Sequence, residues 1–422
     1  MQKMGKDTND AKKGKKSESK PGKRSTTTSK TQEKSVATVD TTPEKKGGVS
    51  QNKKVSKNQS KKVRGGRTNR TKEEKSVITK TTVSVSQHES IRDTDKKEAK
   101  KDKKKWSGED AGISFSKNIL EAKVIQDYEE IQKMTCSEER CRMWSTNMSR
   151  NRNPKYKCYD DNRIIVQNAK IDYINASKIC VPGFPRNVYL VQLPKLDSVD
   201  AIEEFWRMIF TDQCLNVHII AQPSELEAGF DKICGQKAGD FYYANGFFVN
   251  TKKVEKDKDR VDIVVELLPE GCSNSLVVQV YFHTYWKDGN GPDKFQTPVK
   301  TAIQIAKTDE DNNKPIALVS VKGAGRNAAL LSLSVVISSL NQNVEPNIRE
   351  IVRLVREQRP MAVDTVQLYT SIYLATCYFI KSKLNGNSDL LDRLKKFQVK
   401  FEASISAMKA PSATMDEPRE GL

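Results

Sequence analysis

The distribution of aromatic residues limits the part of this chain that can build a hydrophobic core. Residues 1–105 contain no Phe, Trp or Tyr, and the first aromatic residue is Trp106. The same segment carries 32 Lys/Arg and 13 Asp/Glu, which accounts for the whole net charge of +19. Such a segment cannot bury enough apolar surface to offset the entropy cost of ordering it. We therefore predict a disordered, basic tail rich in Lys, Ser and Thr over residues 1–105.

From Trp106 onward the composition is that of a globular protein. We predict one large domain over residues 106–385, then a C-terminal helix and a frayed end over residues 386–422. A run of about 18 apolar residues, the length that a membrane-spanning helix needs, does not occur. The N-terminus shows no apolar segment of the secretory type, and the eight cysteines are therefore expected to be free thiols. These observations favour a cytoplasmic or nuclear location.

The periodicity of apolar residues predicts an α/β fold with a mixed, highly twisted central sheet flanked by helices. Short Val- and Ile-rich runs predict strands at Val188–Val191, Val217–Ile220, Val261–Leu268, Leu276–Phe282 and Ile316–Val319. Helical spacing predicts helices at Ala201–Phe210, Val299–Ala306, Asn327–Leu340, Ile348–Gln358, Thr365–Lys381 and Leu390–Met408.

The segment from Pro315 to Ala328 reads PIALVSVKGAGRNA, which is a strand, a glycine-bearing loop, an arginine and a helix start. Loop amides and a helix N-terminus can converge on one oxyanion, so this pattern is typical of a phosphate cradle. The candidate phosphate-binding residues are Lys322, Gly323, Ala324, Gly325 and Arg326. In the alternative interpretation, Arg326 is a structural arginine at the helix start and binds a neighbouring carboxylate.

Five ordered motifs make the chain similar to the tyrosine-specific protein phosphatase family from Ser114 to Ile380. They are Asp172–Ser177 (the family's DYINAS), Gln192 with Pro194 (Q-G-P), Glu204–Ile209 (DFWRM), Trp286–Asp288 (W-P-D) and Ser320–Arg326 (H-C-x5-R). The resemblance implies a two-step phosphoryl transfer: a cysteine thiolate attacks phosphorus, and the aspartate of the W-P-D loop protonates the leaving phenol.

The nucleophile position of that family is occupied here by Ser320. A serine hydroxyl is far less acidic than a thiol and needs a base or a metal to react. None of the three histidines, His88, His218 and His283, stands where it could serve. The residues that flank the family's active loop are also changed, to Val319 and Asn327. We therefore expect negligible turnover.

Other positions that carry function in the family have changed as well. Lys287 replaces the proline before Asp288, and Asn153 replaces the aromatic residue that stacks on the phosphotyrosine ring. Asp364 and Leu368 stand in the places of two glutamines that handle the hydrolytic water. We expect no catalytic role for Ser320, Asp288, Asp364 or Leu368, and we expect that Ser320→Cys alone does not restore a phosphatase.

These observations predict a catalytically inactive, tyrosine-phosphatase-like protein that binds or scaffolds a phosphoprotein or a kinase. One alternative is an active phosphatase with a non-standard nucleophile. Another is binding of nucleic acid or another polyanion through residues 1–105. We expect no cofactor and no metal; the closest cysteine pair, Cys136 and Cys141, lacks partners at zinc spacing and is interpreted as two ordinary thiols.

Overall fold

The computed structural model describes residues 105–307, 313–384 and 387–409. Apart from Lys105, the predicted basic tail lies outside these residues, and so does the predicted frayed end from residue 410 onward. None of the helices within the described ranges is long and apolar enough to cross a membrane.

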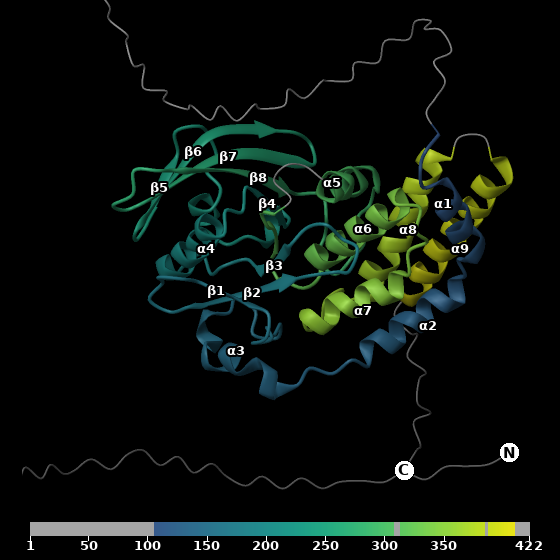
Figure 1. Ribbon diagram of the computed structural model, residues 1–422, viewed down its shortest axis with the longest axis horizontal. Coiled ribbons are helices and arrows are strands. Elements are labelled where there is room, and N and C mark those ends of the chain that lie inside the picture. The colour runs from purple at the N-terminus through teal and green to yellow at the C-terminus, as the bar shows by residue number, and fades with distance from the viewer. Residues whose placement is uncertain (1–104, 308–312, 385–386, 410–422) are drawn as a thin grey trace, which may run out of the picture. The chain divides into compact units, whose positions relative to one another are not determined.

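Four parallel strands form the centre of a nine-stranded sheet (Figure 1). In spatial order they are β3 (Val188–Gln192), β9 (Ile316–Ser320), β4 (Asn216–Ile220) and β8 (Leu276–His283). Strands β3 and β9 are buried along their whole length. A strand covered on both faces reads as a continuous apolar run, which is why the sequence identified these strands readily.

Antiparallel strands extend the sheet at both edges. β2 (Tyr173–Ile179) and β1 (Arg163–Ile165) follow β3 on one side. On the other side β8 is followed by β7 (Arg260–Pro269), β6 (Phe247–Lys256) and β5 (Phe241–Ala244). The predicted mixed sheet is therefore confirmed.

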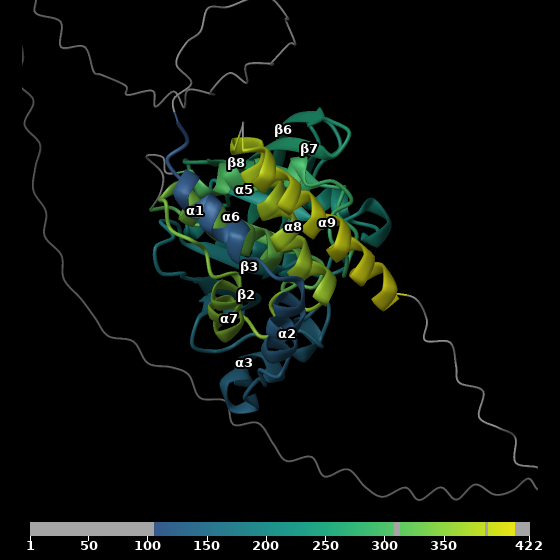
Figure 2. The same cartoon turned by 90° about the vertical axis from the view of Figure 1, so that its right-hand side faces the viewer.

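Helices cover both faces of this sheet (Figure 1). Each face has its own hydrophobic cluster. Helix α4 (Val199–Thr211) packs on β2, β5 and β6, while α6 (Arg326–Asn341) packs on β3 and β9 from the other face. The helices that extend the α6 layer are α1 (Glu109–Asn118), α2 (Glu121–Gln132), α5 (Gln296–Ala306), α7 (Ile348–Gln358), α8 (Val366–Lys383) and α9 (Ser388–Lys409). α1 and α9 are far apart in sequence but lie side by side (Figure 2).

Local sequence explains where several helices begin. Ser198, Asn347 and Thr365 precede α4, α7 and α8, and each side chain accepts a hydrogen bond from an N–H three residues later at 3.1–3.2 Å. These are N-cap contacts. The predicted strands and helices are all present with ends within three residues. Strands β1, β2, β5 and β6 and the helices α1, α2 and α3 (Arg142–Thr146) were not predicted.

Two histidines from neighbouring parallel strands meet inside the sheet. Nδ1 of His218 on β4 lies 3.1 Å from Nε2 of His283 at the end of β8, and both rings are fully buried. Burial, with Arg260 nearby, lowers the pKa of His218 to about 3. Burial and the neighbouring His218 also lower the pKa of His283 well below its usual value. The pair is therefore neutral in the folded protein.

We predict that this pair makes the fold sensitive to mild acid. The unfolded chain takes up protons on these histidines below about pH 6.5 while the folded pair stays neutral, so stability is lost as the pH falls. Each histidine contributes a slope of about 1.4 kcal/mol per pH unit in this window. The unfolding free energy, measured with urea between pH 7 and pH 5, should depend less steeply on pH for a His218→Gln/His283→Gln variant than for the unaltered chain. An unchanged slope would contradict the assignment.

Candidate functional site

The site lies where the carboxyl ends of the four parallel strands converge. Gln192 ends β3, Ser320 ends β9, Glu225 lies in the loop after β4 and Asp288 in the loop after β8. In sheets of this kind, functional groups gather outside the carboxyl ends of parallel strands. The topology thus brings together residues that are far apart in the sequence.

The loop from Ser320 to Arg326 has a tightly defined backbone. Gly323 has φ of +72°, and its N–H donates to both the carbonyl oxygen and Oγ of Ser320 at 3.1 Å. A Cβ atom on Gly323 would lie 2.6 Å from the backbone nitrogen of Gln192. The carbonyl oxygen of Ala324 accepts a hydrogen bond from the N–H of Val363 at 2.8 Å. Only glycine fits at position 323.

A fully buried arginine holds this loop in place. Arg359 donates from Nε to the carbonyl oxygen of Gly323 at 3.0 Å, and from its two terminal nitrogens to Ser177 Oγ at 3.3 Å and Asn175 Oδ1 at 2.5 Å. Burial lowers the pKa of Arg359 below its usual value, but an arginine remains protonated. Asn175 and Ser177 belong to the DYINAS-like segment, so that motif supports the loop.

Gln192 secures the loop from the other side. Its amide nitrogen donates to the carbonyl oxygens of Asn153 at 3.1 Å and Lys322 at 3.2 Å, and its amide oxygen accepts from the N–H of Asn153 at 3.2 Å. The structure therefore places Asn153 beside the loop, as the sequence predicted for the residue at the phosphotyrosine pocket. A short amide side chain at that position offers no ring for stacking.

Ser320 is buried and engaged in hydrogen bonds. Its hydroxyl donates to Asn327 Oδ1 at 3.0 Å and accepts from the N–H of Gly323. The orientation of the Asn327 amide follows from its other contacts: Nδ2 donates to Leu318 O at 3.0 Å, and Oδ1 accepts from the N–H of Ala328 at 3.0 Å. Position 320 therefore faces an acceptor oxygen, which disfavours an anion there.

Arg326 begins α6 and is almost fully buried. Its guanidinium donates to both carboxylate oxygens of Glu225, at 3.2 and 2.7 Å, and to the carbonyl oxygen of Trp286 at 2.5 Å. Glu225 also accepts from the N–H of Asp288 at 3.2 Å. The geometry agrees with the alternative in which Arg326 binds a neighbouring carboxylate.

Lys322 occupies the mouth of the loop and pairs with two carboxylates. Its Nζ lies 2.6 Å from Asp288 Oδ2 and 3.5 Å from Asp364 Oδ2. Burial lowers the pKa of Lys322, but the hydrogen bond to Asp288 and the charge of Asp364 outweigh this effect, so that the pKa is raised overall. The Tyr156 hydroxyl donates to Asp364 Oδ2 at 2.5 Å.

The remaining predicted positions pack around this network. Leu368 on α8 is fully buried, and a Cβ atom on Gly325 would lie 3.4 Å from its Cδ1 atom and 2.8 Å from Asp364 Oδ1. The predicted site residues thus lie in or around the loop from Ser320 to Arg326. The two cations, Lys322 and Arg326, face three carboxylates, those of Glu225, Asp288 and Asp364.

Sequence reasoning missed three residues that shape the site: Tyr156, Glu225 and Arg359. Glu225 follows β4 in a short 3-10 turn whose sequence carries no recognisable motif. Tyr156 lies three residues after Asn153 and could have been considered as a nearby aromatic. Arg359 directly follows α7 and contacts residues 36 and more positions away, so no local pattern identifies its role.

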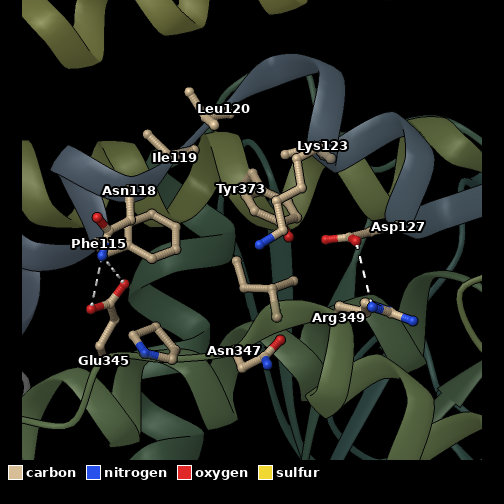
Figure 3. A pocket seen from close by; sticks show the side chains of 13 residues that line it. Phe115, Asn118, Ile119, Leu120, Lys123, Asp127, Glu345, Asn347, Arg349 and Tyr373 are labelled. Atoms are coloured by element: carbon tan, nitrogen blue, oxygen red, sulfur yellow. Dashed lines mark hydrogen bonds and ion pairs between the residues drawn. The ribbon is translucent and has the colours of Figure 1, made fainter.

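Two sizeable cavities lie away from this loop. One of about 430 Å³ is bounded by residues from α1, α2, α7 and α8, and two pairs of its polar side chains contact each other (Figure 3). Asn118 donates to Glu345, and Arg349 lies 3.9 Å from Asp127. The second, of about 440 Å³, is lined by residues from the loop after β4 and from β6, β7 and β8. Among the residues described, no three His, Cys, Asp or Glu side chains are grouped to hold a metal ion.

We predict that the loop does not tolerate a side chain at Gly323. Gly323→Ala should lower the unfolding free energy by more than about 2 kcal/mol, because it adds backbone strain and an overlap with Gln192. Gly183 is a matched control, since it also has a positive φ, +78°, but open space around it. Gly183→Ala should cost only about 1 kcal/mol in urea unfolding. Equal losses would show that the overlap is unimportant.

Comparison with known proteins agrees with this geometry. A protein of Caenorhabditis elegans, named a candidate tyrosine-protein phosphatase, is 28% identical over 266 residues, which are 63% of this chain and 64% of that protein. A second such protein from the same organism is 25% identical over 311 residues, 72% of this chain and 69% of its own length. Human tyrosine-protein phosphatase non-receptor type 20 is 29% identical over 237 residues, 54% of either chain. The match thus spans just under two thirds of the first relative.

Solved structures show the same fold. The protein tyrosine phosphatase TcPTP1 of Trypanosoma cruzi superposes with a TM-score of 0.54 at 17% identity, over 63% of this chain and 96% of that one. A structure of PTPN18 gives a TM-score of 0.53 at 20% identity, over 64% and 99%. The family model "Protein-tyrosine phosphatase" matches residues 147–378, which is more than half of the chain. The chain therefore belongs to the protein-tyrosine phosphatase family.

Proposed function

We propose that this protein is a pseudophosphatase, which binds or scaffolds phosphoproteins or signalling partners such as a kinase without hydrolysing phosphate. The observation that carries the proposal is the state of Ser320 at the nucleophile position. Its hydroxyl is buried and donates to Asn327 Oδ1. A serine reacts only when a base accepts its proton, and an amide oxygen cannot act as that base.

The histidines do not supply the missing base. In the part of the chain that the structure describes, His218 and His283 are hydrogen-bonded to each other and kept neutral by burial. His88 lies outside the described residues. Asp288, which would have to protonate a leaving group, is engaged by Lys322 at 2.6 Å. Attack and leaving-group protonation therefore both lack a free participant.

The charges around the loop support conditional binding of a phosphate group. Three carboxylates face two cations, so an incoming phosphate dianion meets excess negative charge unless a carboxylate withdraws. Asp288 is the most exposed of the three, with 34% of its side chain accessible, against 21% for Glu225 and 5% for Asp364. We infer that movement of Asp288 away from Lys322 opens the loop to a phosphorylated partner.

The compartment forms part of the same proposal. All eight cysteines lie within the described residues and are free thiols, which agrees with a reducing compartment such as the cytoplasm or the nucleus. The basic residues that could contact a polyanion lie outside the described range, so this alternative stays a prediction from the sequence.

Phosphate release tests whether Ser320 acts as a nucleophile. The full chain should hydrolyse an aryl phosphate or a phosphotyrosine peptide no faster than a Ser320→Ala variant, because the hydroxyl lacks a base. The measurement is phosphate release at substrate concentrations up to the millimolar range. Release that Ser320→Ala abolishes would identify an active phosphatase with a serine nucleophile, the competing function.

A cysteine at position 320 tests the role of Asn327. In Ser320→Cys the new thiol faces Asn327 Oδ1, so its pKa should stay near the usual value of about 8.5 and turnover should remain negligible. In Ser320→Cys/Asn327→Ser a hydroxyl can donate to the thiolate, and the pKa should fall by about one unit or more. The rate of iodoacetamide alkylation against pH measures both values. A low pKa in the single variant would refute the role given to Asn327.

Removing the charge of Asp288 tests whether a phosphorylated partner binds through the loop. Asp288→Asn removes the nearer of the two carboxylate partners of Lys322 and one negative charge, so affinity for a phosphotyrosine peptide should rise by about tenfold. Arg326→Ala in the same background should reverse the gain. Asp161→Asn is the matched control, because Asp161 is also an ion-paired carboxylate but pairs with Arg140. If Asp288→Asn and Asp161→Asn bind the peptide equally, the loop is not the binding site.

A further inference from the structure

Two cysteines that the proposed function does not use are in contact with each other, one partly exposed and one buried. Cys136 lies in the loop that follows α2, and Cys141 ends the 3-10 turn η1 (Glu138–Cys141). Their sulfur atoms are 3.4 Å apart. Both are free thiols; Cys141 is fully buried, whereas Cys136 is partly exposed. Two thiols five residues apart in the sequence are thus already in contact in the folded chain.

Charged contacts and aromatic packing hold the turn that carries the pair. Arg140 lies over the ring of Tyr159 at 3.9 Å and pairs with Asp161 at 2.6 Å. Lys157 pairs with Glu138, also in the turn. Cys141 itself packs with Trp144, Tyr159 and Tyr173. The backbone around Cys141 is therefore fixed with the sulfur atoms facing each other.

We propose that Cys136 and Cys141 form a redox modification site, at which a hydroperoxide converts the dithiol into a reversible intramolecular disulfide. The sulfur atoms need to approach by only about 1.4 Å to reach the bond length of about 2.05 Å. The site is separate from the Ser320–Arg326 loop, and the inference does not rest on the proposed binding function.

The reaction proceeds in two steps. The thiolate of Cys136 attacks one oxygen of the hydroperoxide; an S–O bond forms, the O–O bond breaks, and the other oxygen leaves as hydroxide or alkoxide. The sulfur of Cys141 then attacks the sulfur of Cys136; the S–O bond breaks, and the thiol proton of Cys141 leaves with the hydroxyl group as water. Two electrons pass from the sulfur atoms to the peroxide. A dithiol reductant reverses the change.

The different environments of the two sulfurs set this order. Cys136 is the thiol that solvent and peroxide can reach. Burial raises the pKa of Cys141, and the neighbouring Cys136 raises it further, so Cys141 is a poor first nucleophile but stands in contact with the oxidised sulfur. Cys141 therefore acts as the resolving thiol.

Peptide mapping of the oxidised full chain tests the proposal. The reduced protein is treated with stoichiometric hydrogen peroxide, its remaining thiols are alkylated, and it is digested with trypsin without reduction. Cleavage after Arg140 separates the two cysteines, so the disulfide links the peptide of residues 134–140 to the peptide of residues 141–142. We expect this linked pair to be about tenfold more abundant than any disulfide of the exposed thiols Cys180 and Cys272, because only its second step is intramolecular.

Two variants check the assigned roles. In Cys141→Ser the oxidation should stop at the sulfenic acid of Cys136, which dimedone traps; in Cys136→Ser, Cys141 should remain a thiol under the same peroxide dose. The proposal is overturned if Cys180 and Cys272 are oxidised in the unaltered chain while Cys136 and Cys141 still accept the alkylating reagent. It is also overturned if Cys136 is recovered bonded to a cysteine other than Cys141.

Discussion

The shape of the site depends on one guanidinium group that lies wholly inside the domain. Arg359 donates to the carbonyl oxygen of Gly323 in the loop and to Asn175 and Ser177 on β2. Removing this group would leave the carbonyl oxygen of Gly323 and Oδ1 of Asn175 without this donor, and each unsatisfied buried group costs about 1–3 kcal/mol. The DYINAS-like segment and the loop after β9 are therefore parts of one buried network. The contribution of this network to stability explains its presence without any catalytic role.

This network holds the loop in its conformation whether or not the loop carries a nucleophile. The glycine conformation, the start of α6 and the buried Arg326 all persist in a chain that carries serine where the family carries cysteine. The side chains that changed now satisfy one another: Ser320 with Asn327, and Lys322 with Asp288 and Asp364. These contacts hold the loop together through its own side chains, and we propose that its opening to a ligand depends on Asp288.

The sequence predicted the parts of the fold whose signal is local. Buried parallel strands such as β9 and the apolar helix α6 are continuous in the sequence, and the loop between them is a compact motif. The edge strand β5 and the short strand β1 were missed because few of their residues are buried and their pairing is set by neighbours. The motif singled out Lys322 and Arg326, and the structure places Lys322 beside Asp288 and Asp364 and Arg326 beside Asp288.

The partners of those residues could not be predicted in the same way. Arg326 binds Glu225 across 101 residues, and Tyr156 reaches Asp364 across 208. Such contacts depend on how strands β3, β9, β4 and β8 are ordered, which no local pattern encodes. The contact between Cys136 and Cys141 illustrates the same limit at short range: the spacing suggested two ordinary thiols, and only the fold of the turn brings the sulfur atoms together.

We propose that the Ser320 hydroxyl does not act as a nucleophile, although it occupies the nucleophile position. The most direct test is the intact mass of the full chain after rapid acid quenching of a reaction with a phosphotyrosine peptide, because acid preserves a phosphoserine ester. We expect an unmodified mass at all times from milliseconds to hours. A phosphoryl group gained by the chain and located on Ser320 by fragmentation would contradict it.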